Sequence, residues 1–577
     1  MICPQCQKQN REQAHYCKWC GSALSNDNTG PLADLVGMDK VKKQLMTLVA
    51  RYEEHQRRMK TTGVSQPFTA NIIISGEMGT GKTMLVEVIE KLFSQKGMTK
   101  HPATYILNSE EFDAFRNAKD FDANLAKAKG GILCIDAVHK LLPNGQDTNT
   151  TTLDRIFSGV QTWKGDPFVI LCGWSVVLDS YLKNNPNIRD RFDMVINLPG
   201  YTYEELTEIC SRRLMLTYGL GLSEDARQKL LRVVRQAKRD RLTDANGYYA
   251  KNLADTIALK HNSNATHQTS SFISPDEIDG KEYVEKTFEE AIKQMDKYIG
   301  VDKIKDNIRN LTTMMQMQSQ RDGSEIKCKD HFLFLGNPGT GKTTIARVFA
   351  DVMAAMGVLK VGQLIEVTRK DLVASFVGQT APMVEAAVNK AIGGILFVDE
   401  AYTLSQSEND TFGKEAIDTL LKLMEDRRGE FICIAAGYDH EMNEFLGTNS
   451  GLASRFNETI HFDDYTGEQL YDIFQMMMKG NKLTLNPDDE VWTRNYFKKM
   501  YLMRGAKFGN ARDVRNVLDK AKKRQAHRLL ELQKVDPQAA MQQNCIITKI
   551  DICDEDEEKS VDQILEELDA FVGMDNI

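Results

Sequence analysis

The sequence predicts an α/β protein made of two tandem copies of one module, preceded by a small cysteine-rich segment. Three observations lead to this prediction. Apolar strand-like runs followed by glycine-rich turns and helical patterns occur twice, with matched positions about 263 residues apart. Each copy closes with a mainly helical stretch, and four cysteines cluster at the N-terminus. At 577 residues the chain also exceeds what one hydrophobic core spans, which favours several folded units.

The overall composition is typical of a soluble globular protein. Hydrophobic residues make up 42% of the chain and charged residues 27%. No apolar run reaches the length of a membrane span and the N-terminus has no signal-peptide pattern, so we expect a cytoplasmic protein without a membrane partner. The formal net charge of -8 offers no overall electrostatic footprint for nucleic acid, which we therefore do not expect as a partner.

The four N-terminal cysteines have the spacing of a zinc site. They follow the pattern C-x2-C-x10-C-x2-C and are Cys3, Cys6, Cys17 and Cys20. Each pair can place two thiolates on one turn, and two turns complete a closed tetrahedral Zn²⁺ shell whose binding energy would fold the segment. The doubled spacing disfavours a redox pair, and free surface thiols at this density would be unusual. We predict a structural zinc ribbon over residues 1–24, followed by a flexible linker over residues 25–33.

A phosphate-binding loop follows the apolar run 331–335. The pattern G-x4-G-K-[ST] is matched by Gly336, Asn337, Pro338, Gly339, Thr340, Gly341, Lys342 and Thr343. The glycines allow a tight turn that aims N–H groups at phosphate oxygens, and the helix that begins next adds its positive dipole end. The Lys342 ammonium would then contact the outer phosphates of ATP, and the Thr343 hydroxyl would bind Mg²⁺.

A second strand-like run, residues 394–398, ends in two carboxylates. Asp399 would hold the Mg²⁺, and Glu400 would orient and activate the attacking water. A P-loop match alone could arise by chance, but a partner strand about fifty residues later makes a mere glycine turn plus core strand improbable. The sequence therefore predicts nucleotide hydrolysis here, with Lys342 and Glu400 as catalytic groups.

The first copy of the module keeps the phosphate-binding residues but changes the catalytic ones. Retained are Gly76, Gly79, Thr80, Gly81, Lys82, Thr83 and Asp136. Ala137 stands at the position of Glu400, and a methyl group can neither accept a proton nor orient a water. Tyr248 stands at the position of Arg512. We expect a module that binds nucleotide tightly, hydrolyses it poorly and serves as a scaffold; the alternative is a module that has lost binding too.

The repeats set the expected domain boundaries. The first module is predicted over residues 34–262, a polar linker over 263–286 and the second module over 287–530. Residues 531–577 are predicted to form a tail that contains a disordered acidic stretch. The last ten residues, 568–577, echo the start of both modules. The tail is therefore either the beginning of a third repeat or a terminal helix that resembles the motif by chance.

Longer motifs in the second module resemble a known protein family. They are Arg369-Lys-Asp-Leu-Val-Ala-Ser-Phe-Val-Gly-Gln-Thr-Ala381, Val398-Asp-Glu-Ala-Tyr-Thr-Leu404, Ala436-Gly-Tyr438, Gly451-Leu-Ala-Ser-Arg-Phe456 and Gly509-Asn-Ala-Arg512. Together they resemble the CbxX/CfqX family of AAA+ ATPases, over almost the whole second module and more weakly over the first. The resemblance implies, in each module, a five-stranded parallel P-loop sheet with helices on both faces and a small helical lid. It also implies a homo-oligomeric ring, with six subunits expected.

The resemblance further implies roles for two arginines and one loop. Arg455 matches the arginine that reaches a neighbouring subunit's γ-phosphate and takes part in catalysis, and Arg512 matches the nucleotide-binding sensor of the lid. The central-pore loop that contacts substrate polypeptide is matched by Phe376, Val377 and Gly378. The alternatives are a surface cation for Arg455, a helical salt-bridge partner for Arg512 and a core aromatic for Phe376.

These features predict an ATP-driven protein remodeller whose second module hydrolyses ATP. The expected cofactors are ATP, Mg²⁺ and Zn²⁺, and the expected partner is a protein client or adaptor recruited by the zinc ribbon. The alternative is a nucleotide-controlled assembly scaffold or switch in which no client is threaded. A motor stimulated by nucleic acid would conflict with the acidic charge balance.

Overall fold

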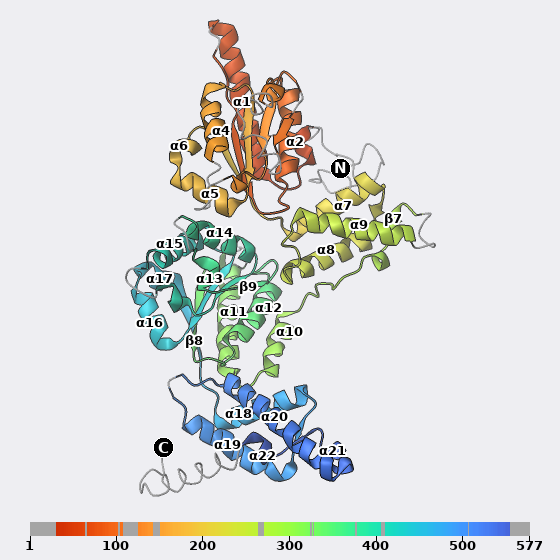
Figure 1. Ribbon diagram of the computed structural model, residues 1–577, viewed down its shortest axis with the longest axis vertical. Helices are drawn as coiled ribbons and strands as arrows, with labels where there is room; N and C mark the ends of the chain where they lie inside the picture. Colours follow the sequence, from red (N-terminus) through yellow and green to blue (C-terminus); the bar gives the residue numbers. More distant parts are fainter. Residues whose placement is uncertain are drawn as a thin grey trace. The chain divides into compact units, whose positions relative to one another are not determined.

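The computed structural model describes residues 30–63, 66–101, 104–107, 125–141, 150–263, 270–322, 326, 328–374, 378–405, 410–505 and 507–553. Two compact units divide the chain, with the main division between Glu285 and Lys286. Each repeat consists of an α/β domain followed by a helical lid, and Figure 1 colours these elements along the sequence. The predicted architecture of two α/β modules with lids is therefore confirmed.

The first α/β domain contains a five-stranded parallel sheet in the order β2-β3-β4-β1-β5. The strands are β1 (Ile72–Gly76), β2 (Thr104–Leu107), β3 (Ile132–Ile135), β4 (Phe168–Gly173) and β5 (Met194–Leu198). The helices are η2 (Pro31–Asp34), α1 (Asp39–Thr62), α2 (Lys82–Gln95), η4 (Val138–Lys140), α4 (Thr150–Thr162), α5 (Ser175–Asn184) and α6 (Pro186–Arg189). Because strand side chains alternate, Ile74 packs in one core with α1 and α2, and Ile73 in another with α4 and α5. Helices thus cover both faces, and Figure 1 shows α4 and α2 on opposite sides of the strands.

The second α/β domain repeats this topology in the order β9-β10-β11-β8-β12. The strands are β8 (His331–Gly336), β9 (Leu364–Val367), β10 (Ile395–Val398), β11 (Ile432–Gly437) and β12 (Phe456–Phe462). The helices are α10 (Phe288–Lys293), η6 (Gln294–Lys297), α11 (Asp302–Asp322), α12 (Lys342–Ala355), α13 (Arg369–Leu372), α14 (Thr380–Ala391), η7 (Ala401–Ser405), α15 (Thr411–Asp426), α16 (Asp439–Gly447) and α17 (Ser450–Arg455). One core of this domain is aromatic, since Phe332 and Phe334 of the P-loop strand pack against Phe349 of α12.

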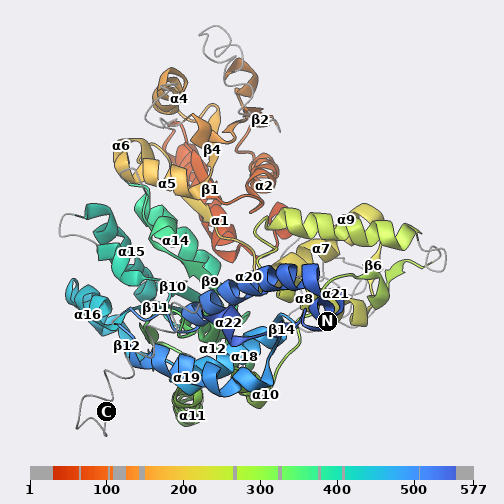
Figure 2. The same cartoon turned by 60° about the horizontal axis from the view of Figure 1, so that its bottom comes forward.

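A helical lid follows each sheet. The first lid contains α7 (Tyr203–Tyr218), β6 (Gly221–Leu222), α8 (Glu224–Arg239), α9 (Gly247–Ser263), β7 (Phe272–Ile273) and η5 (Pro275–Glu277). The second lid contains α18 (Gly467–Gly480), β13 (Thr484–Leu485), η8 (Pro487–Asp489), α19 (Glu490–Leu502), α20 (Ala511–Val535), α21 (Pro537–Gln542), β14 (Ile546–Ile547) and α22 (Lys549–Ile552), and Figure 2 shows α18, α19, α20 and α22 gathered together. Both lids begin with a capping box, Thr202 with Glu205 and Thr466 with Gln469, which fixes where each first helix starts.

The segment predicted as the linker 263–286 belongs in large part to the first lid. Strand β7 pairs in parallel with β6, and the Glu277 carboxylate is buried against the His261 ring with a distance of 2.7 Å from Oε1 to Nδ1. The Tyr283 backbone N–H donates to the Arg232 carbonyl oxygen over 3.0 Å. The polar composition of this segment predicted a linker, but Glu277 and the Tyr283 N–H are bonded to residues of α9 and α8.

The second lid extends past the predicted boundary at residue 530. Helix α20 continues to Val535, and α21, β14 and α22 follow it. The Arg528 guanidinium pairs with the buried Asp551 carboxylate over 2.9 Å, and Gln525 Nε2 donates to the Ile546 carbonyl oxygen over 2.9 Å. The predicted tail is therefore folded up to residue 553, while residues 554–577, with the suggested third repeat, lie outside the described residues. The last residues of the predicted linker 25–33 likewise belong to a helix, because η2 begins at Pro31.

Candidate active site

The second P-loop connects strand β8 to helix α12. Its three glycines have positive φ angles of 145°, 75° and 96°, and they are Gly336, Gly339 and Gly341. A Cβ atom at Gly339 would lie 2.2 Å from the Gly509 carbonyl oxygen of the lid, so this position needs glycine for two reasons. Lys342 Nζ donates hydrogen bonds to the carbonyl oxygens of Gly336 and Asn337, over 2.7 and 2.9 Å. The ammonium therefore lies against the loop whose N–H groups are suited to bind phosphate.

Asp399 and Glu400 follow strand β10 at the same edge of the sheet. Asp399 Oδ1 accepts a hydrogen bond from the Glu400 backbone N–H over 3.1 Å. Glu400 has a φ of 48°, in the left-handed region, and is exposed to solvent. Burial lowers the pKa of Lys342, and the carboxylates of Asp399 and Asp439 oppose that shift. The P-loop lysine and the two predicted carboxylates of the strand end thus belong to one electrostatic site.

Tyr438 follows strand β11 and joins the same site. Its ring centroid lies 5.6 Å from that of Tyr402 and 5.7 Å from Lys342 Nζ, within the range of a cation–π interaction. Burial raises the pKa of Tyr438, and the Glu400 carboxylate raises it further. The phenol is therefore neutral at physiological pH and keeps a hydrogen to donate.

The two predicted arginines have different surroundings. Arg455 ends α17, and its Nη2 lies 3.1 Å from Glu425 Oε2, with the Arg455 side chain 36% exposed. Arg512 lies in the first turn of α20, and its charge lowers the pKa of Lys342 after the larger effects of burial and the carboxylates. Arg512 therefore belongs to the P-loop site of its own chain, whereas Arg455 is held at the surface by Glu425.

The residues that connect each lid to its P-loop were not predicted from the sequence. In the second repeat, Asn510 is fully buried; its Oδ1 accepts from the Tyr465 N–H over 2.9 Å, and its Nδ2 donates to Asp464 Oδ1 over 2.7 Å. The Tyr465 hydroxyl donates to the Thr340 carbonyl oxygen over 3.1 Å. Asp464 also accepts from Asn337 Nδ2 over 3.0 Å. The lid is therefore bonded to the loop at several points.

The first lid has the same attachment. The Tyr201 hydroxyl donates to the Thr80 carbonyl oxygen over 3.1 Å, and Asn246 Nδ2 donates to the Met78 carbonyl oxygen over 3.1 Å. Asn246 and Asn510 have φ angles of 48° and 50°, values that L residues other than asparagine and aspartate seldom adopt. The signal in the sequence was that this asparagine occurs at matched positions of both repeats.

The first P-loop has the same geometry as the second. Lys82 Nζ donates to the carbonyl oxygens of Gly76 and Glu77 over 2.9 and 2.8 Å, as Lys342 does in its own loop. The Thr80 hydroxyl donates to the Glu77 carbonyl oxygen over 2.9 Å. The retained residues thus give the first loop the same internal hydrogen bonds as the second.

The chemistry around the first loop differs. Ala137 has a φ of 55° and donates its N–H to Asp136 Oδ1 over 2.8 Å, so the backbone matches that of Glu400 without its carboxylate. The tyrosine pair is replaced by Trp174, which stacks on His139 with ring centroids 4.5 Å apart. Tyr248, at the position of the lid arginine, is 52% exposed. At the positions of Glu400 and Arg512 the first site therefore has neither a carboxylate nor a positive charge.

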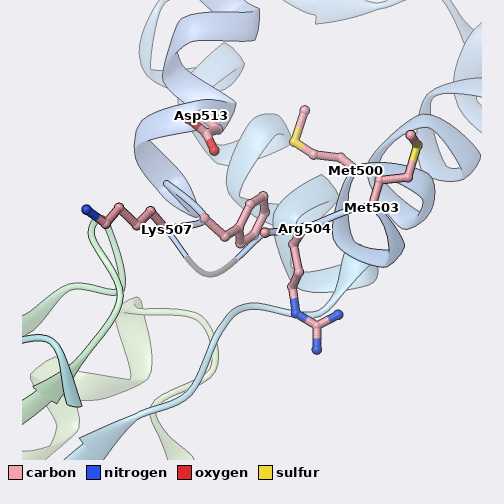
Figure 3. Close-up of a pocket in the computed structure, with 7 residues that line it drawn as sticks. Met500, Met503, Arg504, Lys507 and Asp513 are labelled. Carbon is pink, nitrogen blue, oxygen red and sulfur yellow. The ribbon is translucent and has the colours of Figure 1, made fainter. Parts of the chain in front are cut away.

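A separate pocket is formed by residues from the end of α19 to the start of α20, as Figure 3 shows. It is lined by Met500, Met503, Arg504, Gly505, Lys507, Phe508 and Asp513. None of these is a P-loop or strand-end residue, so this pocket is distinct from the nucleotide site. The Asp513 carboxylate accepts the Gly509 N–H over 2.8 Å, which shapes the turn that leads to Asn510.

Two predicted sites fall mainly outside the described residues. The four predicted zinc ligands Cys3, Cys6, Cys17 and Cys20 lie there, as do Phe376 and Val377 of the predicted pore loop, whereas Gly378 is described and has a φ of 81°. Within the described ranges, no cluster of three or more histidine, cysteine or acidic side chains is arranged to hold a metal ion. None of the helices in that part of the chain has the length and hydropathy of a membrane span.

The fold and the two loops define a P-loop ATPase whose two loops have different surrounding side chains. The ATPase family associated with various cellular activities (AAA) matches residues 72–200 and 332–464, and the AAA lid domain matches residues 466–562. The chain belongs to this family. The match to the lid domain falls on the second lid and agrees with the extension of that lid past residue 530.

Three relatives illustrate the similarity. Stage V sporulation protein K of Bacillus subtilis is 42% identical over 245 residues, which are 42% of this chain and 76% of the relative. The chloroplastic ribulose bisphosphate carboxylase/oxygenase activase of Cyanidioschyzon merolae is 38% identical over 253 residues, 43% of this chain and 86% of the relative. Protein CbbX of Cereibacter sphaeroides is 37% identical over 268 residues, 45% of this chain and 86% of the relative. The chain is thus an ATPase related to the CbbX and CfxQ proteins, as its motifs predicted.

Proposed function

We propose that this ATPase remodels protein clients and that its second module is the hydrolytic engine. One observation carries the proposal. The two P-loops make the same lysine hydrogen bonds, and the residue after each strand-end aspartate has a left-handed φ, but this residue is Glu400 in the second module and Ala137 in the first. The relationship to a protein named as a rubisco activase supports a protein client.

In the proposed reaction, the second P-loop binds the phosphates of ATP through its N–H groups and Lys342. Glu400 accepts a proton from a water molecule, whose oxygen attacks the γ-phosphorus as the bond to the bridging oxygen of ADP breaks. The neutral Tyr438 hydroxyl lies beside this site and can donate to the γ-phosphate. Arg512 supplies charge from the lid, which couples the phosphate state to the lid.

The side chains of the second site fit Mg²⁺. A carboxylate and a hydroxyl, Asp399 and Thr343, are the oxygen ligands that this ion prefers, and the Lys342 charge already interacts with Asp399. When bound, Mg²⁺ would neutralise the charge of the β- and γ-phosphates. Asp136 and Thr83 offer the same two ligands in the first repeat.

The first module would bind nucleotide and hydrolyse it poorly. Its complete loop supports binding, and Ala137 removes the general base. We further propose a ring of six subunits in which Arg455 reaches the nucleotide of its neighbour, since its position at the end of α17 is exposed. A zinc ribbon at residues 1–24, held by its four cysteines, would recruit the client or adaptor in a cytoplasmic setting.

The test is ATP turnover against protein concentration for the unaltered chain, Glu400→Gln, Arg455→Ala and Lys82→Ala. Loss of the general base should lower kcat at least about 100-fold, and loss of the arginine finger by a similar factor or more. Lys82→Ala should reduce turnover only by weakening assembly, so high protein concentration should restore it. Turnover per chain should also rise cooperatively with concentration.

Two outcomes would overturn the proposal. If Glu400→Gln kept its turnover, the second module would not be the engine. If turnover per chain were independent of concentration and insensitive to Arg455→Ala, the ring would be excluded. A nucleotide-controlled scaffold or switch would then be the better account, because it needs neither threading nor catalysis between subunits.

A further inference from the structure

The backbone at Glu400 is held in place by its own loop. A left-handed φ of 48° is unfavourable for a residue with a Cβ, so neighbouring contacts must maintain it. The Glu400 carbonyl oxygen accepts two hydrogen bonds from Thr403, from its N–H over 2.9 Å and from its hydroxyl over 2.7 Å. Helix η7 is thus hydrogen-bonded through Thr403 to the backbone of Glu400.

Arg369 continues this chain of contacts. It follows strand β9, and its Nη1 donates to the Thr403 carbonyl oxygen over 2.8 Å and to Asp410 Oδ2 over 2.6 Å. The two side chains are 26% and 10% exposed, so their charge-assisted bond is largely shielded from water. One guanidinium therefore joins the start of α13, the η7 turn and the residue before α15.

The first repeat provides an internal comparison. Ala137 has the same backbone as Glu400 and its carbonyl oxygen accepts the Lys140 N–H over 2.9 Å, but Lys140, at the position of Thr403, has no hydroxyl. By strand register, Leu107 pairs with Ile135 as Val367 pairs with Val398, so Ser109 stands at the position of Arg369. Neither lysine nor serine can replace the Thr403 hydroxyl and the Arg369 guanidinium, so the side chains that make these bonds accompany the carboxylate in the second repeat.

We propose that Arg369, anchored by Asp410, is a positioning residue that acts through Thr403 to hold the Glu400 carboxylate in line with the attacking water. This inference rests on the proposed role of Glu400 as general base. The hydrogen bonds of Arg369 go to Thr403 and Asp410, which are not P-loop residues. Its loss should therefore disturb the chemical step and leave nucleotide binding intact.

The experiment compares Arg369→Gln, Arg369→Lys and Thr403→Val in the full chain. Arg369→Gln should lower kcat about tenfold or more with KM changed less than about twofold, because a misplaced base loses transition-state stabilisation alone. Arg369→Lys should recover part of the loss, since an ammonium can reach one partner but not fork to both. Thr403→Val removes only the hydroxyl and should lower kcat a few-fold in a chain that still folds.

The matched control is Arg427→Gln. Arg427 also pairs with a carboxylate, Glu430, over 3.1 Å, but both side chains are exposed and lie outside the site. Its kcat and KM should equal those of the unaltered chain. If Arg369→Gln behaved like this control, or if it raised KM without lowering kcat, the positioning role would be wrong.

A double-mutant cycle separates this inference from the proposed function. In single-turnover hydrolysis, Arg369→Gln should have no further effect on a Glu400→Gln chain, because it acts through that side chain. Equal losses in both backgrounds would mean a general structural role and would overturn the inference. Rapid hydrolysis by Glu400→Gln alone would instead overturn the proposed function.

Discussion

His331 and Asn71 lie at the start of the two P-loop strands, and each side chain accepts a backbone N–H of the neighbouring strand. His331 Nδ1 accepts the Cys433 N–H over 2.9 Å, and Asn71 Oδ1 accepts the Val169 N–H over 2.9 Å. Both side chains are 2% exposed. Each satisfies a backbone donor of the neighbouring strand just ahead of the regular pairing, but only the histidine can titrate.

This difference predicts an effect of pH on the stability of the second module. Burial lowers the pKa of His331 to about 4, below the value of about 6.5 in an unfolded chain. Because the folded pKa is depressed, His331 stays neutral in the fold, and stability is complete above about pH 6.5. As pH falls toward 4 the unfolded state takes up the proton first, and up to about 3 kcal/mol is lost.

His331→Asn keeps the hydrogen bond, as Asn71 demonstrates, and removes the proton uptake. We expect a small loss of stability at pH 7 from weaker packing, and a smaller fall in the unfolding temperature of the second module between pH 7 and pH 4.5. Calorimetry at several pH values measures both. His440→Asn, at a side chain 82% exposed, is the control and should follow the unaltered chain. Parallel pH curves for His331→Asn and the unaltered chain would refute the assignment.

Residues whose function depends on neighbours in sequence were predictable, and those whose function depends on distant partners were not. Lys342 and Glu400 stand in contiguous strand-turn motifs, so their types and spacing indicate their chemistry. The bond from Arg369 to Thr403 spans 34 residues and that from Asn510 to Asp464 spans 46. No local periodicity encodes such pairs, because the fold alone brings them together.

At the scale of elements, each lid is bonded directly to its P-loop. Each lid meets its P-loop through a buried asparagine and a tyrosine hydroxyl, and in the second repeat Asp464 joins Asn337 of the loop to Asn510 of the lid. A loop that moves when phosphate binds would therefore pull directly on the first turn of α20.

Asn510 offers a test of this coupling. Asn510→Ala removes four side-chain hydrogen bonds and leaves a Cβ at a φ of 50°, whereas Asn510→Gly removes the same bonds but relieves the backbone. Both variants should bind ADP about tenfold more weakly and should increase hydrogen exchange at 337–341. The alanine variant should unfold at the lower temperature. Unchanged exchange in the glycine variant would show that the lid is not coupled to the loop through Asn510.

The repeats predicted the lids, but not where they end. The segments 270–286 and 531–553 contain two-residue strands and short helices, which have too few residues for a hydrophobic period. Their order comes from buried polar pairs instead, His261 with Glu277 and Arg528 with Asp551. Polar composition alone is the usual mark of a linker, so a sequence reading misses such segments.

At the scale of the whole molecule, the two repeats share one family fold and differ at the positions of the predicted chemistry. Both keep the loop and its lid contacts, and only the second keeps the carboxylate, the tyrosine pair and the lid arginine. If the first module binds nucleotide without hydrolysing it, as we propose, the bound nucleotide would stabilise the assembly. The force on a client would then come from the second module alone.

The proposed division of function predicts that loss of Phe376 and loss of Phe115 have different effects. Phe376→Ala should abolish remodelling while sparing ATP turnover, because a grip on polypeptide is lost and the site is untouched. Phe115→Ala, in the corresponding region of the first repeat, should leave both intact and is the matched control. The client for the assay is the protein that co-purifies with the Glu400→Gln chain in ATP, and its protease sensitivity after incubation with each active chain is the measure. If Phe376→Ala still remodelled that client at the unaltered rate, threading would be excluded and ATP would act as a switch.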